Sequence, residues 1–143
     1  MTAAMPPEAA VWWLRTALGD LAAARALVDV PGVVPREVAY LAQQATEKAL
    51  KATIALQGIE PPLTHDLLFL LERSPGQAGL RHVNVDIVAL SAAQTVARYP
   101  DPEDPPYDRE EVNRLLEDAS RLVIAVQDHF VRLGLAGTDL TPV

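Results

Sequence analysis

The 143-residue sequence contains no cysteine. This absence excludes disulfides, thiolate metal sites and cysteine nucleophiles together, and it is compatible with a reducing cytoplasm. No stretch reaches the ~18 consecutive apolar residues that a membrane-spanning helix needs. The first residues also lack the basic segment of a secretory signal peptide. We therefore expect a cytoplasmic protein that does not contact a membrane.

Positive charge is scarce as well. The chain has 12 lysines and arginines against 19 aspartates and glutamates, which gives a net charge of -7 at pH 7. An acidic surface repels nucleic acid, so RNA binding would require a local basic patch, and we expect no DNA partner.

Several catalytic motifs are missing. The sequence has no phosphate-binding glycine loop, no histidine pair at metal-ligand spacing and no serine elbow. Conventional ATPase, zinc-hydrolase and esterase functions are therefore without support, and we expect neither a metal nor a cofactor.

Composition indicates an ordinary globular protein. Hydrophobic residues make up 50% and charged residues 22% of the chain, well away from the composition of disordered proteins. The length fits one domain. We expect a single helical domain over residues 1–143, with a core at about residues 7–134 and a loose C-terminal tail.

Apolar residues recur at helical spacing in four places. The first segment covers residues 7–29. The second is the clearest, because Pro35 fits its first turn and Gly58 fits the position just past its end. Within it, Glu47 and Lys51 stand at i, i+4 spacing and are predicted to form a modest surface pair.

Weaker signals predict the remaining helices. Thr64 is the expected cap of a short helix over residues 65–72. Residues 84–98 are predicted to be helical, although residues 83–88 could also form a strand. Asp108 and Glu111 form a capping-box pattern at the start of the last helix, which Gly134 ends. These segments predict an all-α fold, an up-and-down bundle of four to five helices.

Four local features carry a resemblance to a known family. They are WWLRTALGDLAAARAL near the N-terminus, YLAQQATEKALKATIALQGIEPPLTHDL in the second helix and its exit, the ARYPD turn, and the long final amphipathic helix. Over residues 11–133 the chain resembles HEPN proteins, in the prokaryotic branch found beside minimal nucleotidyltransferases. The resemblance implies a helical bundle that often dimerises, in a toxin–antitoxin or nucleotide-related setting.

Many HEPN proteins are metal-independent ribonucleases, with an arginine followed after four to six residues by a histidine. Here Arg121 precedes His129 with seven intervening residues, and Arg73 precedes His82 with eight. His65 has no arginine within reach upstream. The standard ribonuclease motif is absent, so whether the chain is an enzyme stays open, with a non-enzyme favoured.

The polar side of the second helix is the first candidate site. Its residues are Gln43, Gln44, Glu47, Lys48 and Lys51. The lysines could bind a phosphate group, while the glutamines form hydrogen bonds with a nucleobase. The alternative is a solvated helix face, or a dimer surface with paired charges.

Two further places could contribute to a site. His65, near a helix N-terminus, could meet an anion or act as a general base, and the alternative is simple capping. Arg98 could bind a phosphate group, while the ring of Tyr99 stacks on a nucleobase. The alternative there is that Tyr99 fills the end of the core. Trp12 and Trp13 are adjacent in sequence, so one is expected in the core and the other in a subunit contact.

The leading hypothesis is a homodimeric HEPN-like protein that binds a nucleotide and works with a minimal nucleotidyltransferase in a toxin–antitoxin-type system. Its nucleotide-binding residues would be Gln44, Lys48, Lys51, His65 and Arg98. The first alternative is an RNA-cleaving toxin with a divergent site built from His65, Arg98 and Tyr99. The second alternative is a purely structural interaction module.

Overall fold

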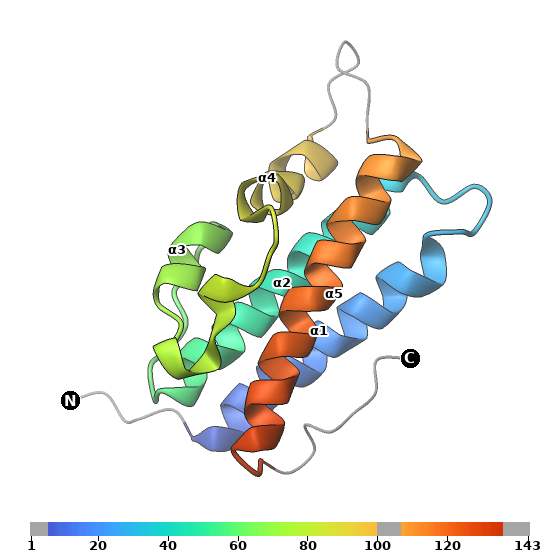
Figure 1. The fold of residues 1–143 in the computed structure, drawn as a ribbon. Coiled ribbons are helices and arrows are strands. Elements are labelled where there is room, and N and C mark those ends of the chain that lie inside the picture. The colour runs from blue at the N-terminus through green and yellow to red at the C-terminus, as the bar shows by residue number, and fades with distance from the viewer. Residues whose placement is uncertain (1–5, 100–106, 136–143) are drawn as a thin grey trace.

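The computed structural model describes residues 6–99 and 107–135. Five α-helices follow one another along the chain: α1 Pro7–Leu27, α2 Pro35–Leu56, α3 Leu67–Glu72, α4 Ile87–Arg98 and α5 Arg109–Arg132 (Figure 1). Two single 3₁₀ turns, Gly76–Ala78 and Leu80–His82, connect α3 to α4. No strand occurs in the described residues, so the predicted all-α bundle is confirmed. The tail that the sequence predicted to be loose lies outside the described residues.

Helix α2 is the centre of the bundle. It packs against α1, α3, α4 and α5, and 14 of its 22 residues are buried. The long helices α1, α2 and α5 lie alongside one another, while α3 and α4 flank α2 (Figure 1). Six buried alanines, over about half of the circumference of α2, let neighbouring helices approach closely. Polar residues on the remaining side, Gln43, Glu47 and Lys51, are buried as well.

The core draws side chains from all five helices. The largest fully buried apolar ones are Leu14, Leu21, Val38, Leu50, Ile54, Leu67, Leu70, Leu80, Leu90, Leu122 and Phe130. Burying each such side chain contributes about 1.5–3 kcal/mol relative to leaving it exposed. Three polar residues of α2 are buried as completely as these: Gln43, Thr46 and Thr53.

Local signals set the ends of α2 and α5 as predicted. Pro35 occupies the start of α2, and Gly58 follows its end with φ at +80°, a conformation that costs glycine little. At the start of α5, Asp108 Oδ1 accepts a hydrogen bond from the Glu111 backbone N–H at 2.8 Å. Glu111 Oε1 accepts one in return from the Asp108 N–H at 3.4 Å. The capping box is therefore confirmed.

The start of α3 differs from the prediction. Its cap is Asp66, whose Oδ1 accepts hydrogen bonds from the N–H groups of Leu68 and Phe69 at 3.1 and 3.2 Å. Thr64 instead accepts a bond from the Asp66 N–H at 3.2 Å. The helix begins at Leu67, so His65 lies in the segment before it, with its backbone free to bond other helices.

Helix α4 also begins later than predicted, at Ile87. Asp86 caps it by accepting a hydrogen bond from the Ala89 N–H at 3.0 Å. The Asp86 N–H donates to Asp118 Oδ2 of α5, also at 3.0 Å. A tertiary contact therefore holds the cap residue and fixes where α4 starts.

The capping box gives a first testable prediction. Replacing Asp108 with alanine leaves the Glu111 N–H without its acceptor, and we expect the free energy of unfolding to fall by about 1 kcal/mol. Urea denaturation followed by circular dichroism measures the change. Asp128→Ala, at an exposed position of the same helix, is the control and should have a smaller effect. Equal losses in both variants would contradict a capping role for Asp108.

Candidate functional site

Glu47 and Lys51 of α2 form a buried ion pair. Lys51 Nζ lies 2.9 Å from Glu47 Oε1, and their side chains are only 8% and 5% exposed, Lys51 first. The prediction of a surface pair is therefore wrong. The physical reason is tertiary, because Trp13 of α1 covers Lys51, with its ring centroid 5.6 Å from Nζ, and His65 covers the other side of Glu47.

Two glutamines complete this network. Gln43 Nε2 donates to Glu47 Oε2 at 3.1 Å and to the His65 carbonyl at 3.4 Å. Gln44 Nε2 donates to Gln43 Oε1 at 2.7 Å and to Glu47 Oε2 at 3.3 Å. No buried polar side-chain atom in the described part of the chain lacks a hydrogen-bond partner. The alternative of a solvated face is therefore wrong for Gln43, Glu47 and Lys51, which are buried in a hydrogen-bonded polar network.

The network keeps Glu47 ionised. Burial raises the pKa of its carboxyl group, but hydrogen bonds with Lys51, His65 and Gln43 outweigh burial and lower the pKa below its ordinary value of 4.5. The carboxylate and the Lys51 ammonium therefore balance each other's charge inside the protein. A buried charge without such a partner would destabilise the fold strongly.

His65 is the exposed end of the network. Its Nδ1 lies 3.0 Å from Glu47 Oε2, while 54% of its side chain is exposed. Its carbonyl accepts the bond from Gln43 and a longer one, at 3.5 Å, from the Ser91 hydroxyl of α4. Glu47 thus holds the imidazole through one ring nitrogen, while Gln43 of α2 and Ser91 of α4 hold the backbone carbonyl of the same residue.

A surface hollow of about 430 Å³ lies beside His65. Its lining residues come from the start of α3 and from α4: His65, Asp66, Leu68, Val88, Ser91, Ala92, Gln94 and Thr95. The polar lining residues thus supply two hydroxyls, one amide, one imidazole and the Asp66 carboxylate around a space large enough for a small polar ligand. Ser91 and Thr95 were not identified from the sequence as site residues.

Arg98 lies at the far end of α4 from His65. It lines a separate hollow of about 390 Å³ together with Arg36, Glu37, Tyr40 and Ala97. Its guanidinium carbon is 5.7 Å from the centroid of the Tyr99 ring. Within the described residues Arg98 forms no ion pair, whereas Arg36 lies 3.7 Å from Glu37.

Tyr99 and Lys48 take positions that the sequence did not settle. Tyr99 is 69% exposed, so the alternative that it fills the end of the core is wrong. Lys48 Nζ lies 2.7 Å from Asp20 Oδ2 of α1. Among the predicted nucleotide-binding residues, the structure brings Gln44, Lys51 and His65 together around Glu47. It places Lys48 against α1 and Arg98 at the end of α4.

The other two histidines lie outside this network. His82 is exposed in the second 3₁₀ turn. His129 is only 6% exposed, and burial together with the nearby Arg132 lowers its pKa. Arg121 donates to Asp118 at 3.2 Å and to the Asn84 carbonyl at 3.3 Å. The Arg121–His129 combination therefore forms no exposed arginine–histidine site within the chain.

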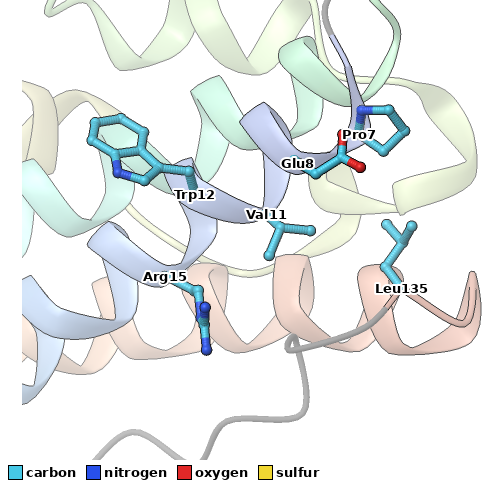
Figure 2. Close-up of a pocket in the computed structure, with 6 residues that line it drawn as sticks. All are labelled: Pro7, Glu8, Val11, Trp12, Arg15 and Leu135. Carbon is cyan, nitrogen blue, oxygen red and sulfur yellow. The ribbon is translucent and has the colours of Figure 1, made fainter.

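A further hollow, of about 400 Å³, lies on α1 (Figure 2). It is lined by Pro7, Glu8, Val11, Trp12, Arg15 and Leu135. Trp12 is 58% exposed there, while Trp13 is partly buried against the core, as expected for one of the two tryptophans. None of the predicted nucleotide-binding residues lines this hollow, so it is separate from the His65 site.

Residues 6–99 and 107–135 contain no group of three or more side chains that could ligate a metal ion. None of the helices in these residues is both long and apolar enough to cross a membrane.

Comparison with known proteins identifies the family. The model of the HEPN domain matches residues 10–129, so the chain belongs to the HEPN family. The chain is also similar to a solved structure, that of TT1696 from Thermus thermophilus, with 26% sequence identity and a TM-score of 0.69. The similarity covers 83% of this chain and 96% of TT1696. The comparison with curated proteins finds no match.

The buried pair gives a second prediction. Lys51→Met leaves Glu47 as an unpaired buried charge, and we expect a loss of about 3–5 kcal/mol in the free energy of unfolding. The double variant Glu47→Gln/Lys51→Met removes both charges and should be more stable than Lys51→Met alone. Urea denaturation measures both variants.

The matched control is the exposed i, i+4 pair of Glu110 and Arg114. Arg114→Met should change stability by less than about 1 kcal/mol, as is usual for surface pairs. A Lys51→Met variant no less stable than this control would contradict the buried pair.

Proposed function

We propose that this HEPN protein binds a nucleotide along α4, between His65 and Arg98, and acts as the partner of a small nucleotidyltransferase. The main support for the binding proposal is His65, whose side chain is held in place by the protein. His65 is held by buried Glu47 at 3.0 Å, yet 54% of its side chain is exposed and it lines an open hollow. Such an arrangement orients a polar side chain before any ligand arrives, which lowers the entropic cost of binding.

The polar residues of α4 extend the site from His65 towards Arg98. Ser91, Thr95 and Arg98 are spaced i, i+4 and i+7, so they share one side of the helix. At 1.5 Å per residue, Ser91 and Arg98 are separated by roughly 10 Å along the axis, a span comparable with a nucleotide. We assign the base or sugar to the His65 hollow and the phosphates to Arg98.

Charge favours Arg98 over the two lysines as the phosphate ligand. Lys48 and Lys51 already pair with Asp20 and Glu47, and releasing Lys51 would leave a buried carboxylate unpaired. The hollow of Arg98 contains the guanidinium groups of two arginines and one carboxylate, in a chain of net charge -7. The excess of one positive charge in this hollow supports our assignment of it as the local basic patch that anion binding requires. Lys51 would then act by positioning Glu47 and His65.

The partnership with a nucleotidyltransferase rests on family membership and on the QQATEKALKA…THDL motif, which resembles the branch beside minimal nucleotidyltransferases. A toxin–antitoxin-type role is part of the same proposal. Co-expression with the small nucleotidyltransferase encoded nearest to this gene should yield a stoichiometric complex on size-exclusion chromatography. Separate elution of the two chains at tens of micromolar would count against the partnership.

Nucleotide binding gives the third prediction. Titration calorimetry with ATP should show weak binding that weakens further as salt is added. Arg98→Ala should weaken binding by about 1.5–3 kcal/mol, the range for a lost hydrogen bond to a charged group. Arg114→Ala, which removes an exposed arginine of α5, is the control for net charge. No heat with ATP or other common nucleotides, or equal effects of the two variants, would overturn the binding site.

The contact between His65 and Glu47 also favours a second candidate, a divergent ribonuclease, because a carboxylate-oriented histidine can act as a general base. Cleavage additionally requires a cation within hydrogen-bond reach of the same phosphate. Arg98 lies roughly 10 Å along α4 from the serine that contacts His65. The two groups of one chain are therefore poorly placed to act on one phosphate.

The fourth prediction is accordingly that the isolated protein cleaves little or no RNA, with or without magnesium. Purified protein is incubated with total cellular RNA beside the His65→Ala/Arg98→Ala double variant. Robust cleavage that the double variant loses would favour the ribonuclease candidate over the binding protein. Equal cleavage by both proteins would exclude these two residues as its source.

A further inference from the structure

The hollow on α1 is lined mainly by apolar side chains (Figure 2). Its volume of about 400 Å³ lies within the range of roughly 300–1,000 Å³ that is usual for small-molecule sites. Most of its wall is formed by four apolar residues, Pro7, Val11, Trp12 and Leu135. Polar residues predominate instead around the hollows of His65 and Arg98. The α1 hollow therefore suits a ligand with an apolar body.

Trp12 gives this hollow an exposed aromatic side chain with a fixed neighbour. The side chain is 58% exposed. Its ring centroid lies 5.1 Å from that of Trp13, with the two ring planes at 77°, an edge-to-face arrangement that is favourable for aromatic pairs. Trp13 is itself packed against the core. An aromatic ligand thus meets an indole that is already oriented, which lowers the entropic cost of binding.

Glu8 and Arg15 supply the charges of the hollow (Figure 2). They are seven residues apart on one side of α1, which corresponds to roughly 10 Å along the helix axis. Glu8 is in the first turn of α1, where a carboxylate compensates the positive end of the helix dipole. Arg15 is exposed farther along the helix, and a guanidinium can donate two parallel hydrogen bonds to a carboxylate. The charges therefore favour an anionic group at the Arg15 end.

A series of contacts leads from this hollow to His65. Trp13 contacts Trp12, and its own ring centroid lies 5.6 Å from Lys51 Nζ. Lys51 pairs with Glu47 at 2.9 Å, and Glu47 in turn lies 3.0 Å from Nδ1 of His65. The side chains of Lys51 and Glu47 are buried, and closely packed groups transmit a displacement of their neighbours. A displacement of the Trp13 ring therefore changes the surroundings of His65.

We propose that the α1 hollow is an effector site for a small aromatic carboxylate, and that its occupancy changes the position of His65. The aromatic body lies against Trp12 and the carboxylate binds Arg15. Binding displaces the exposed Trp12 ring and with it Trp13, from which the buried contacts continue to His65. The regulatory meaning of this change rests on the proposed function of His65, whereas the binding of the carboxylate does not.

The fifth prediction concerns binding of phenylbutyrate, which joins a phenyl ring to one carboxylate. The chain has two tryptophans, and the indole N–H signal of Trp12, assigned with Trp12→Phe, should shift during an NMR titration. Phenylbutylamine has the same ring with the opposite charge and should bind more weakly. Arg15→Gln should weaken phenylbutyrate binding by about fivefold, the upper end for an exposed ion pair. Arg114→Gln, at an exposed arginine of α5, is the control for net charge and should bind as the wild type does.

The same titration measures the change at His65. At constant pH, the imidazole C–H signals of His65, assigned with His65→Gln, should shift with the same dissociation constant as the Trp12 signal. His82 is exposed in the second 3₁₀ turn, outside the series of contacts, and its signals should not shift. The double variant Glu47→Gln/Lys51→Met keeps both tryptophans, so it should bind phenylbutyrate but lose most of the shift at His65. Circular dichroism shows whether each variant is folded.

The outcomes separate this proposal from the nucleotide proposal. An unchanged Trp12 signal at millimolar phenylbutyrate, or equal affinities of wild type and Arg15→Gln, would overturn the site. A shift at Trp12 without one at His65, or equal shifts at His65 and His82, would overturn the effector role. A Trp12 signal that changes with protein concentration alone would place a second copy in the hollow and would also overturn the site. These readouts need no nucleotide, so they stand even if ATP gives no heat with the wild type.

Discussion

The buried pair of Glu47 and Lys51 is the interaction on which the rest of the site depends. Removing both charges from water costs several kcal/mol per ion unless each is paired and hydrogen-bonded. The carboxylate meets this condition through Lys51, Gln43 and His65, and the segment before α3 must therefore stay against α2. The position of His65, the hollow beside it and the packing of α4 on that segment all follow from this requirement.

The helices were predictable because their signals are local. Pro35, Gly58 and the Asp108–Glu111 box act within one turn of the backbone, and the structure confirms each of them. The starts of α3 and α4 were misplaced for the opposite reason. Thr64 and Asp66 are both competent caps, and Asp86 is held by Asp118, which is 32 residues away in the sequence. The choice between such candidate caps depends on tertiary contacts, which the spacing of apolar residues along the sequence does not reveal.

The candidate site was only partly predictable for a related reason. The spacing of Gln43, Glu47 and Lys51 is the same whether these side chains are buried or exposed to solvent. In the structure they are covered by Trp13 on one side and by His65 on the other. The alanines of α2 do not distinguish the two cases. At about 100° per residue, its six buried alanines span little more than half of the helix circumference, and Gln43, Glu47 and Lys51 lie on the remaining side. The burial of these polar residues is therefore decided by tertiary contacts, which the pattern of one helix does not contain.

The chain has only two lysines, Lys48 and Lys51, and both are held by carboxylates. The lysines of α2 therefore stabilise the bundle, and in the proposed site the recognition of an anion falls to arginine. Stability and the proposed ligand binding are nevertheless linked, because Glu47 pairs with Lys51 and also holds His65. A substitution in the buried pair is therefore expected to change the position of His65 as well as the stability of the bundle.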